Sequence, residues 1–302
     1  MKIVIAGAGF LGRPLANALR DDGHHISILT RQSTPSAPPG LRAVTWTPDG
    51  TAGTWAAELE SAGAGINLAG ESIAGSRWTA SQKRRILDSR VLATRSLAQA
   101  IARAVTPPPV FVSGSAVGYY GPRGDELITE EARPGTDFLA GVAVQWETEA
   151  LRAARSSTRV VLVRTGLVLD RDGGALPQML PPFRFGIGGR LGSGQQYWPW
   201  IHRQDWIDLV RFALETPGAA GPLNATAPHP VTNADFTRAL ARALKRPALV
   251  PAPAFGLRLL LGEMADALLL SGQRAVPAKA ERLGFTFTFK HLDDALHALF
   301  ER

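Results

Sequence analysis

The sequence predicts an α/β fold, in which a doubly wound parallel sheet is followed by a small, mostly helical subdomain. Over the first 165 residues, short apolar runs alternate with helical stretches, and the runs lack polar alternation. After about residue 170, Gly/Pro-rich loops and shorter helices replace this pattern. Alternating strands and helices indicate a parallel sheet that is covered on both faces. Ligands of such sheets bind beyond the carboxyl ends of the strands, at the topological switch point.

The elements of the sheet follow one another in a regular order. The predicted strands are residues 3–6, 25–30, 41–46, 65–69, 110–113 and 159–164. The predicted helices are residues 11–20, 80–104 and 141–154, and residues 33–40 are predicted to form a loop. We assign residues 1–170 to a nucleotide-binding domain whose sheet is completed within residues 200–230, and residues 171–302 to a substrate-side and C-terminal domain.

Composition narrows the class of protein. With 45% apolar and 20% charged residues in 302, the chain is neither disordered nor collagen-like. It contains no cysteine, which excludes thiolate metal sites and disulfides and favours a cytoplasmic location. The formal charge is +7, but its bases are scattered, and the densest run, residues 83–85, is typical of a solvated helix face. Nucleic acid is therefore not an expected partner.

No export signal or membrane-spanning segment is predicted. The apolar N-terminus, residues 1–8, continues into glycines and a helical pattern rather than a cleavage site. Residues 254–270 are apolar but contain three charged side chains, whereas a span needs about 20 nearly uncharged residues. We predict that they form one amphipathic helix buried on one side, and we expect no membrane partner.

A glycine-rich loop joins the first strand to the first helix. Its sequence is Gly7-Ala-Gly9-Phe10-Leu11-Gly12, which fits the Rossmann-type G-x-G-x-x-G pattern in the required strand–loop–helix context. The first glycine permits the tight turn, the second admits a pyrophosphate and the third lets the helix pack on the strand. The helix N-terminus offers its free N–H groups and dipole to the phosphates. The loop predicts a dinucleotide site that includes the backbone of Phe10 and Leu11.

The residues after the second strand indicate which dinucleotide is bound. A binder of NAD normally carries Asp or Glu there, to hold the ribose hydroxyls. This chain has Leu29-Thr30-Arg31-Gln32 instead, without an acid. Arg31 is suited to a charge-assisted bond with a 2′-phosphate, and Thr30 can add its hydroxyl. The alternative is a surface arginine at a strand end. We predict that NADP(H) is preferred over NAD(H).

Further motifs give the chain a family resemblance. Asn67-Leu-Ala-Gly70, with the glycine-rich loop, is similar to short-chain dehydrogenases/reductases of the extended kind. Other segments narrow the resemblance to the little-characterised "epimerase family" of atypical extended members, over essentially the whole chain. These segments are Glu71, Arg77-Trp78, Ser89-Arg90 with Thr94, Ser113-Gly-Ser115, Gly118-Tyr-Tyr-Gly121, Trp146-Glu147, Arg164–Leu169, Gly173-Gly174, Trp200-Ile-His202 with Asp205, Asn224, and a C-terminal module at about 250–298 with Gly272-Gln-Arg274.

The resemblance implies cofactor contacts beyond the loop. It places Leu68, Ala69 and Gly70 on the adenosine side after the fourth strand, and Val168 near the nicotinamide. It also implies that Arg90, on the long helix, reaches the cofactor, although a salt bridge on the helix surface is an equal alternative.

The resemblance also implies a substrate pocket near the same edge. Glu71 and Arg77 are candidates for its lining, and Glu71 can equally cap a helix or pair with Arg77. Trp200 and His202 are further candidates; Trp200 has core packing as its alternative. For His202 with Asp205 a structural hydrogen-bonding role is the favoured alternative. The histidines show no metal-ligand spacing, so no metal is expected.

The chain departs from the family pattern at the proton-transfer residues. Extended members carry Tyr-x-x-x-Lys, but here Leu139 and Ala143 stand at the corresponding positions, and neither can transfer a proton. Ser115 still matches the serine that binds a substrate hydroxyl or carbonyl. Tyr119 and Tyr120 are the candidate replacements for the acid/base, and the alternative for Tyr120 is a packed aromatic at a turn.

The sequence thus predicts an NADP(H)-binding oxidoreductase or epimerase/dehydratase-like enzyme. Its small-molecule substrate is an unidentified hydroxyl or carbonyl compound, with nucleotide sugars among the candidates. The second hypothesis is a non-catalytic NADP(H)-binding regulatory protein, because the Tyr/Lys pair is absent. The oligomeric state, monomer or homodimer, is left open.

Overall fold

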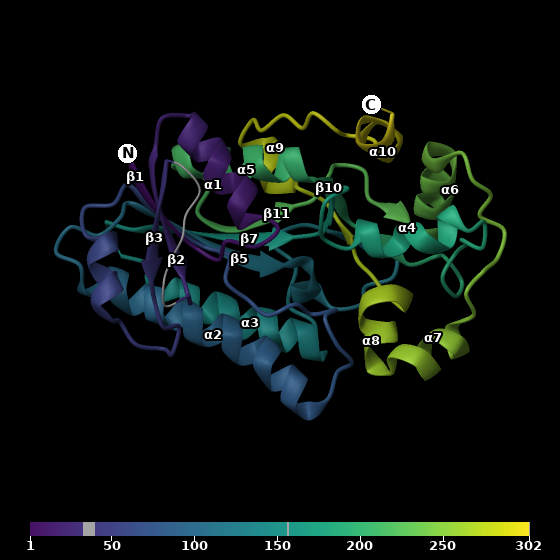
Figure 1. The fold of residues 1–302 in the computed structure, drawn as a ribbon, viewed down its shortest axis with the longest axis horizontal. Helices are drawn as coiled ribbons and strands as arrows, with labels where there is room; N and C mark the ends of the chain where they lie inside the picture. The colour runs from purple at the N-terminus through teal and green to yellow at the C-terminus, as the bar shows by residue number, and fades with distance from the viewer. Residues whose placement is uncertain (33–39, 156, 302) are drawn as a thin grey trace.

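A computed structural model describes residues 1–32, 40–155 and 157–301 of the chain. Within them, a seven-stranded sheet has the order β11-β7-β5-β4-β1-β2-β3, with every neighbouring pair parallel. The strand order reverses between β1 and β4, so the switch point predicted for the ligand lies at the ends of these two strands. The predicted doubly wound, Rossmann-like fold is confirmed (Figure 1).

The first six sheet strands and the helices α1, α2 and α3 lie within a few residues of the predicted ranges, whereas β11, η1, α5 and α9 had no predicted range of their own. The strands are β1 Lys2–Ala6, β2 His25–Thr30, β3 Leu41–Thr45, β4 Ala64–Asn67, β5 Val110–Ala116, β7 Arg159–Thr165 and β11 Gly221–Ala225. The helices are α1 Gly12–Asp21, η1 Thr54–Leu59, α2 Ala80–Arg103, α3 Phe138–Leu151, α5 Arg203–Glu215 and α9 Ala278–Arg282. The loop predicted at 33–40 lies, apart from Gly40, outside the described residues.

Each face of the sheet has its own hydrophobic core. On one face, β-strand residues such as Ile3 and Val161 pack against α1 and α5. On the other face, Val4 and Phe111 pack against η1 and α2, and α3 lies alongside α2 (Figure 1). Because both faces are buried, the strands show the continuous apolar runs on which their prediction depended.

The remaining elements form the substrate side and the C-terminal part. They are η2 Val117–Tyr120, β6 Leu127–Ile128, β8 Leu167–Leu169, α4 Leu176–Arg184, β9 Tyr197–Trp198, β10 Trp200–His202, β12 Val231–Thr232, α6 Asn233–Leu244, α7 Ala254–Leu261, α8 Glu263–Ala265, the π-helical turn η3 Asp266–Leu270, β13 Arg274–Ala275 and α10 Leu292–Phe300. A third core of α4, α6 and α10 side chains holds much of this part together.

The single amphipathic helix predicted for residues 254–270 is wrong. Gly262, at a φ of 63°, separates α7 from α8, and η3 follows directly. None of the side chains of α7 is buried, and Phe255 and Leu259 are 75% and 81% exposed. The apolar run predicted burial, but the glycine breaks the helix and tertiary packing leaves its first half on the surface. In the described part of the chain, no helix is long and apolar enough to cross a bilayer.

Candidate dinucleotide site and the buried network beside it

The glycine-rich loop passes close to the end of β4. Gly7 has a φ of 97°, and a Cβ at this position would lie 2.6 Å from the carbonyl carbon of Leu68 and 2.7 Å from the amide nitrogen of Ala69. A Cβ on Gly12 would lie 1.8 Å from the carbonyl oxygen of Gly7. Both positions therefore require glycine, for the turn and for the packing of α1 against β1.

The middle glycine of the loop faces open space. A Cβ built on Gly9 would meet nothing within 4 Å, so the backbone here is accessible to a ligand. Helix α1 begins beside it with Leu11 as N-cap, without a side-chain hydrogen bond and without an acidic residue in the first turn. The first N–H groups of α1 have no side-chain cap, as expected of an anion-binding helix N-terminus. The residues present fit a pyrophosphate.

Phe10 of the loop packs under a second glycine motif. Cβ atoms on Gly173 and Gly174 would lie 2.5 Å and 2.8 Å from its ring, so both glycines allow the loop after β8 to lie against it. Val168 of β8 is buried in the same core cluster as Phe10. The structure thus brings Val168, predicted to lie near the nicotinamide, to the glycine-rich loop.

The end of β2 carries the residues predicted to select the dinucleotide. Arg31 follows the strand directly and is exposed, and its side chain takes part in no ion pair among the described residues. The Thr30 hydroxyl accepts a hydrogen bond from the Gln32 amide at 3.3 Å. The carboxyl edge next to the glycine-rich loop therefore carries a base where a binder of NAD carries an acid.

Asn67 fixes the shape of the chain after β4. Its side chain donates to the Thr94 hydroxyl at 2.8 Å and accepts from the Ala69 amide at 3.2 Å. These bonds tie the turn 67–70 to α2. Leu68 and Ala69 are partly buried against the two sheet cores, and Gly70 is exposed.

Arg90, for which the resemblance implies a cofactor contact, reaches from α2 to the turn 67–70. A Cβ on Gly70 would lie 3.1 Å from the guanidinium carbon of Arg90, which is 5.2 Å from the ring centroid of Trp146. Burial lowers the pKa of Arg90 to about 10, and the charge of Glu71 opposes that shift. Its hydrogen bond goes to the Ile86 carbonyl, and no salt bridge of Arg90 is found among the described residues. The salt-bridge alternative is therefore not supported.

Glu71 and Arg77 are not joined in the described structure. The Glu71 amide donates to the Ser89 hydroxyl at 2.9 Å. Arg77 is exposed, and its guanidinium donates to the Leu259 carbonyl at the end of α7. The segment after β4 thus contacts the C-terminal part of the chain, but the proposed pair is not formed.

Ser115 points at α3 and contacts a carboxylate there. Its hydroxyl donates to Glu147 Oε1 at 2.6 Å, and both residues are buried. Glu147 lies on α3 two turns after Leu139 and one turn after Ala143, the positions at which the resemblance expects the Tyr/Lys pair. The hydrogen of Ser115 is therefore engaged, and its oxygen remains able to accept a hydrogen bond.

Arg164 is the centre of a buried polar network. Its Nε and Nη2 contact the two carboxylate oxygens of Glu147 at 2.8 and 2.9 Å, and its Nη1 donates to the Tyr120 hydroxyl at 3.0 Å. Burial by itself would lower the pKa of Arg164, but the hydrogen bonds and charges of Glu147 and Tyr120 raise it above its ordinary value. The arginine is permanently charged, and the bidentate pair fixes the position of the carboxylate.

The network continues to the C-terminal module through Tyr120 and Asn224. The Tyr120 hydroxyl donates to Asn224 Oδ1 at 2.6 Å, and Asn224 Nδ2 donates to the Val276 carbonyl. Glu130 accepts from the amides of Asn224 and Lys279, and burial raises its pKa. The chain segments around β5, β7, β11 and α9 are therefore joined by buried hydrogen bonds.

Tyr119 and Tyr120 are in different environments. Tyr120 is fully buried, and burial raises its pKa to about 12 although Arg164 opposes the shift. Its hydroxyl has both partners within the protein, as in the packed-aromatic alternative, so it is not placed to meet a substrate. Tyr119 is partly exposed, and the Arg164 guanidinium carbon lies 3.5 Å from its ring centroid.

Trp200 and His202 have structural contacts. Trp200 is fully buried and its indole N–H donates to the His229 carbonyl, so it does not wall a pocket. His202 caps α5 by accepting from the Gln204 amide, and its ring lies 4.1 Å from that of Phe289. Asp205 accepts the amides of Thr288 and Phe289, both at 2.9 Å. For all three, the structural alternative fits the geometry.

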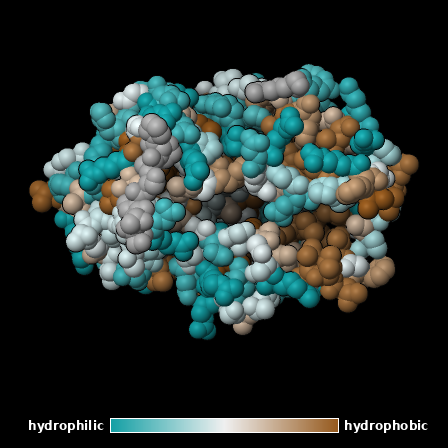
Figure 2. Space-filling model, viewed as in Figure 1, coloured by the Kyte–Doolittle hydropathy of each residue, from teal (hydrophilic) through white to brown (hydrophobic). Residues whose placement is uncertain are grey.

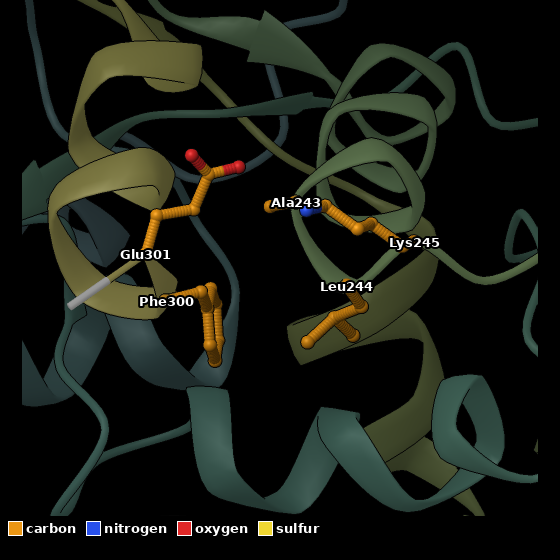
Figure 3. Close-up of a pocket in the computed structure, with 5 residues that line it drawn as sticks. All are labelled: Ala243, Leu244, Lys245, Phe300 and Glu301. Carbon is orange, nitrogen blue, oxygen red and sulfur yellow. The ribbon is translucent and has the colours of Figure 1, made fainter.

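A hollow of about 480 Å³ lies between the ends of α6 and α10 and is separate from these residues. It is lined by Ala243, Leu244, Lys245, Phe300 and Glu301 (Figure 3). It contains no residue of the glycine-rich loop and none of the predicted substrate pocket. We do not place the cofactor or the substrate there.

Sequence reasoning gave no role to Arg164, Glu147 or Asn224, although all three stand in the motifs that carry the resemblance. What could have indicated a role for them is that each is a charged or amide residue within an otherwise apolar strand or a buried helix. Arg164, which follows an apolar run inside the strand 159–165, requires a buried partner, because an unpaired charge is rarely buried. The sequence does not say which acid supplies it.

The sheet order, the glycine-rich loop and the open N-terminus of α1 define a dinucleotide-binding protein of the extended short-chain dehydrogenase/reductase type. The chain belongs to the NAD dependent epimerase/dehydratase family, whose model matches residues 3–225. A domain of unknown function matches residues 252–299.

Relatives are similar over nearly the whole chain. An epimerase family protein of Mycobacterium leprae, ML0860, is 41% identical over 97% of this chain and 94% of its own length. The human epimerase family protein SDR39U1, solved with NADPH, is 36% identical, with a TM-score of 0.91 over 100% of both chains. A nucleoside-diphosphate sugar epimerase of Corynebacterium glutamicum is 33% identical, with a TM-score of 0.80 over 99% of this chain and 58% of its own.

Proposed function

We propose that the chain binds NADP(H) in preference to NAD(H), with the phosphates on the glycine-rich loop and α1. The observation that carries the proposal is Arg31, an exposed base at the end of β2 beside a loop open at Gly9. The NADPH present in the human relative supports it. Phe10, Leu11, Leu68 and Val168 supply the further contacts.

Titration calorimetry of Arg31→Ala tests this preference. Loss of a charge-assisted hydrogen bond lowers NADPH affinity by about 1.5–3 kcal/mol, or about 10- to 150-fold, and leaves NADH affinity unchanged. Arg103→Ala is the matched control, since Arg103 is exposed at the end of α2 that leads to the amino end of β5. An equal loss for both cofactors in Arg31→Ala contradicts the NADP(H) assignment.

As the catalytic function, we propose an oxidoreductase or epimerase/dehydratase-like reaction at a hydroxyl or carbonyl carbon. The bound cofactor supplies or accepts the hydride. Ser115 accepts a hydrogen bond from the substrate hydroxyl, because its own hydrogen is donated to Glu147. Tyr119 is the candidate for proton transfer, since Tyr120 is fully buried and satisfied. The nucleoside-diphosphate sugar relative makes nucleotide sugars the first substrates to try.

A non-catalytic NADP(H)-binding regulator is the second candidate function. It is favoured by Leu139 and Ala143 at the Tyr/Lys positions and by the engagement of Ser115 with Glu147. Calorimetry of the NADPH-loaded chain against a panel of nucleotide sugars and small carbonyls distinguishes the two. A ligand that binds only the loaded chain, with turnover lost in Tyr119→Phe, supports the enzyme; NADPH binding without any second ligand supports the regulator.

A further inference from the structure

An unusually apolar surface covers part of the C-terminal half of the molecule. We define the C-terminal apolar face as Phe185, Ile187, Leu249, Val250, Phe255, Leu259 and Leu260. These large apolar side chains are 51–83% exposed, so they project from the surface. Figure 2 shows apolar residues gathered over α7 and α8, at the lower right of the view.

The members of this face are neighbours in space although two chain segments supply them. Residues 186–192 lie beside residues 248–254: the Val250 amide donates to the Gly188 carbonyl, and the Ala252 amide to that of Arg190. A Cβ on Gly189 would lie 2.0 Å from the Val250 carbonyl oxygen. Phe185 and Ile187 therefore adjoin Leu249, Val250 and the start of α7. A contiguous apolar area of this kind marks an interaction surface.

Bases outnumber acids around the face. Residues 173–204 and 236–262 contain no Asp or Glu, although the whole chain has 26. Arg184, Arg190, Lys245 and Arg246 are exposed in these segments, and no salt bridge neutralises them within the described residues. These four bases leave an excess of positive charge beside the apolar side chains, although Asp266 pairs with Arg258 of α7 and Glu263 with Lys83.

We propose that the C-terminal apolar face docks on an anionic lipid bilayer, with the apolar side chains in the interface and the four bases against the headgroups. Projecting Phe and Leu next to Lys and Arg is the pattern of surfaces that lie in the membrane interface. Each base near an anionic surface adds about 1 kcal/mol of attraction. A symmetric contact between two copies is disfavoured, because it sets the same positive charges against each other.

This docking is peripheral and does not depend on the proposed function. It replaces the expectation that no membrane takes part, which was drawn from the lack of a spanning segment and from scattered charge. The bases are scattered along the whole chain, but the acids are absent from the two segments that form this face. Folding brings these two segments together, so that their exposed bases lie on one surface.

Vesicle co-sedimentation of the full chain tests the proposal. We expect binding to mixed phosphatidylcholine/phosphatidylglycerol vesicles and not to phosphatidylcholine alone. Phe255→Ser/Leu259→Ser lowers the partition constant by about tenfold or more, because apolar burial is lost. Arg184→Gln/Arg246→Gln lowers it by about 30-fold. The controls are Val105→Ser, which is 93% exposed, and Arg103→Gln/Arg155→Gln, all at the amino-end side of the sheet.

Several results overturn the proposal. One is the absence of binding to anionic vesicles at low salt; another is an equal loss in the control and face variants, which indicates diffuse charge attraction. A dimer that Phe255→Ser/Leu259→Ser dissociates, without vesicle binding, assigns the face to a second copy instead. Exclusive binding of a soluble acidic protein also contradicts bilayer docking. Thermal unfolding followed by circular dichroism verifies that each variant is folded, as the exposure of the substituted side chains leads us to expect.

Discussion

The polar groups at the two halves of the carboxyl edge of the sheet differ in exposure and in hydrogen bonding. Around β1, β2 and β4, Gly9 borders open space and Arg31 is exposed without an ion pair among the described residues. Around β5, β7 and β11, the polar residues are buried and joined by hydrogen bonds. Ser115 and Arg164 both donate to Glu147, and Arg164 also donates to Tyr120. The first half presents groups for a ligand to satisfy, whereas the second satisfies most of its own groups within the protein and leaves the Ser115 oxygen able to accept a hydrogen bond.

This difference bears on the cofactor-binding and catalytic roles that we propose. Unsatisfied backbone N–H groups and a free base suit the recognition of a phosphorylated cofactor. Buried, fully paired groups contribute structural specificity and are costly to disturb. Leu139 and Ala143, where the resemblance expects the Tyr/Lys pair, lie next to the second kind of region, in which the Ser115 hydroxyl donates to Glu147. We therefore expect substitutions in the two halves to have different signatures.

The largest expected effect comes from breaking the buried ion pair. Arg164→Met leaves the Glu147 carboxylate buried without its partner and lowers the free energy of unfolding by about 3–5 kcal/mol. Urea unfolding measures the change. The double variant Arg164→Met/Glu147→Gln removes both charges and is expected to recover part of the loss. A loss within about 1 kcal/mol for the single variant would mean that the network does not hold the β5–β7 region together.

Two glycines of the glycine-rich loop allow stability and cofactor binding to be tested separately. Gly7→Ala combines a φ of 97° with a clash against the turn 68–69, and costs about 2–4 kcal/mol of stability as well as cofactor binding. Gly9→Ala meets no protein atom, so it keeps the stability and weakens only NADPH binding. Thermal unfolding and calorimetry of both variants measure the two properties. Wild-type NADPH affinity in Gly9→Ala contradicts the placement of the pyrophosphate.

The smallest expected change in stability comes from replacing each of the two adjacent tyrosines, Tyr119 and Tyr120, with phenylalanine. Tyr120→Phe removes a hydroxyl that is bonded to Asn224 and Arg164, and lowers stability by about 1–2 kcal/mol with unchanged NADPH affinity. Tyr119→Phe is its matched control, with stability unchanged within about 0.5 kcal/mol. The midpoints of denaturant unfolding of the two variants measure these stability changes. The reverse order of the two midpoints would show that the Tyr120 hydroxyl is not part of a stabilising network.

The sequence by itself determined most elements of the sheet, and it supplied the prediction of the dinucleotide site. The apolar runs gave the strands to within a few residues, because strands of a sheet covered on both faces must be apolar throughout. The glycine-rich loop and Arg31 were readable because they lie within one strand–loop–helix–strand unit. Local chemistry and short chain separation were sufficient for them.

Only the tertiary structure decided the buried network and the exposed face of α7. Arg164 is separated along the chain from its partners Glu147 and Tyr120 by 17 and 44 residues, and Asn224 is separated from Tyr120 by 104. No local sequence pattern can therefore select these hydrogen-bond partners. The apolar run at 254–270 predicted burial, but the periodicity of a helix does not state whether another element packs against it. Contacts between distant segments are fixed by packing of the whole chain, and that information is absent from any single stretch of sequence.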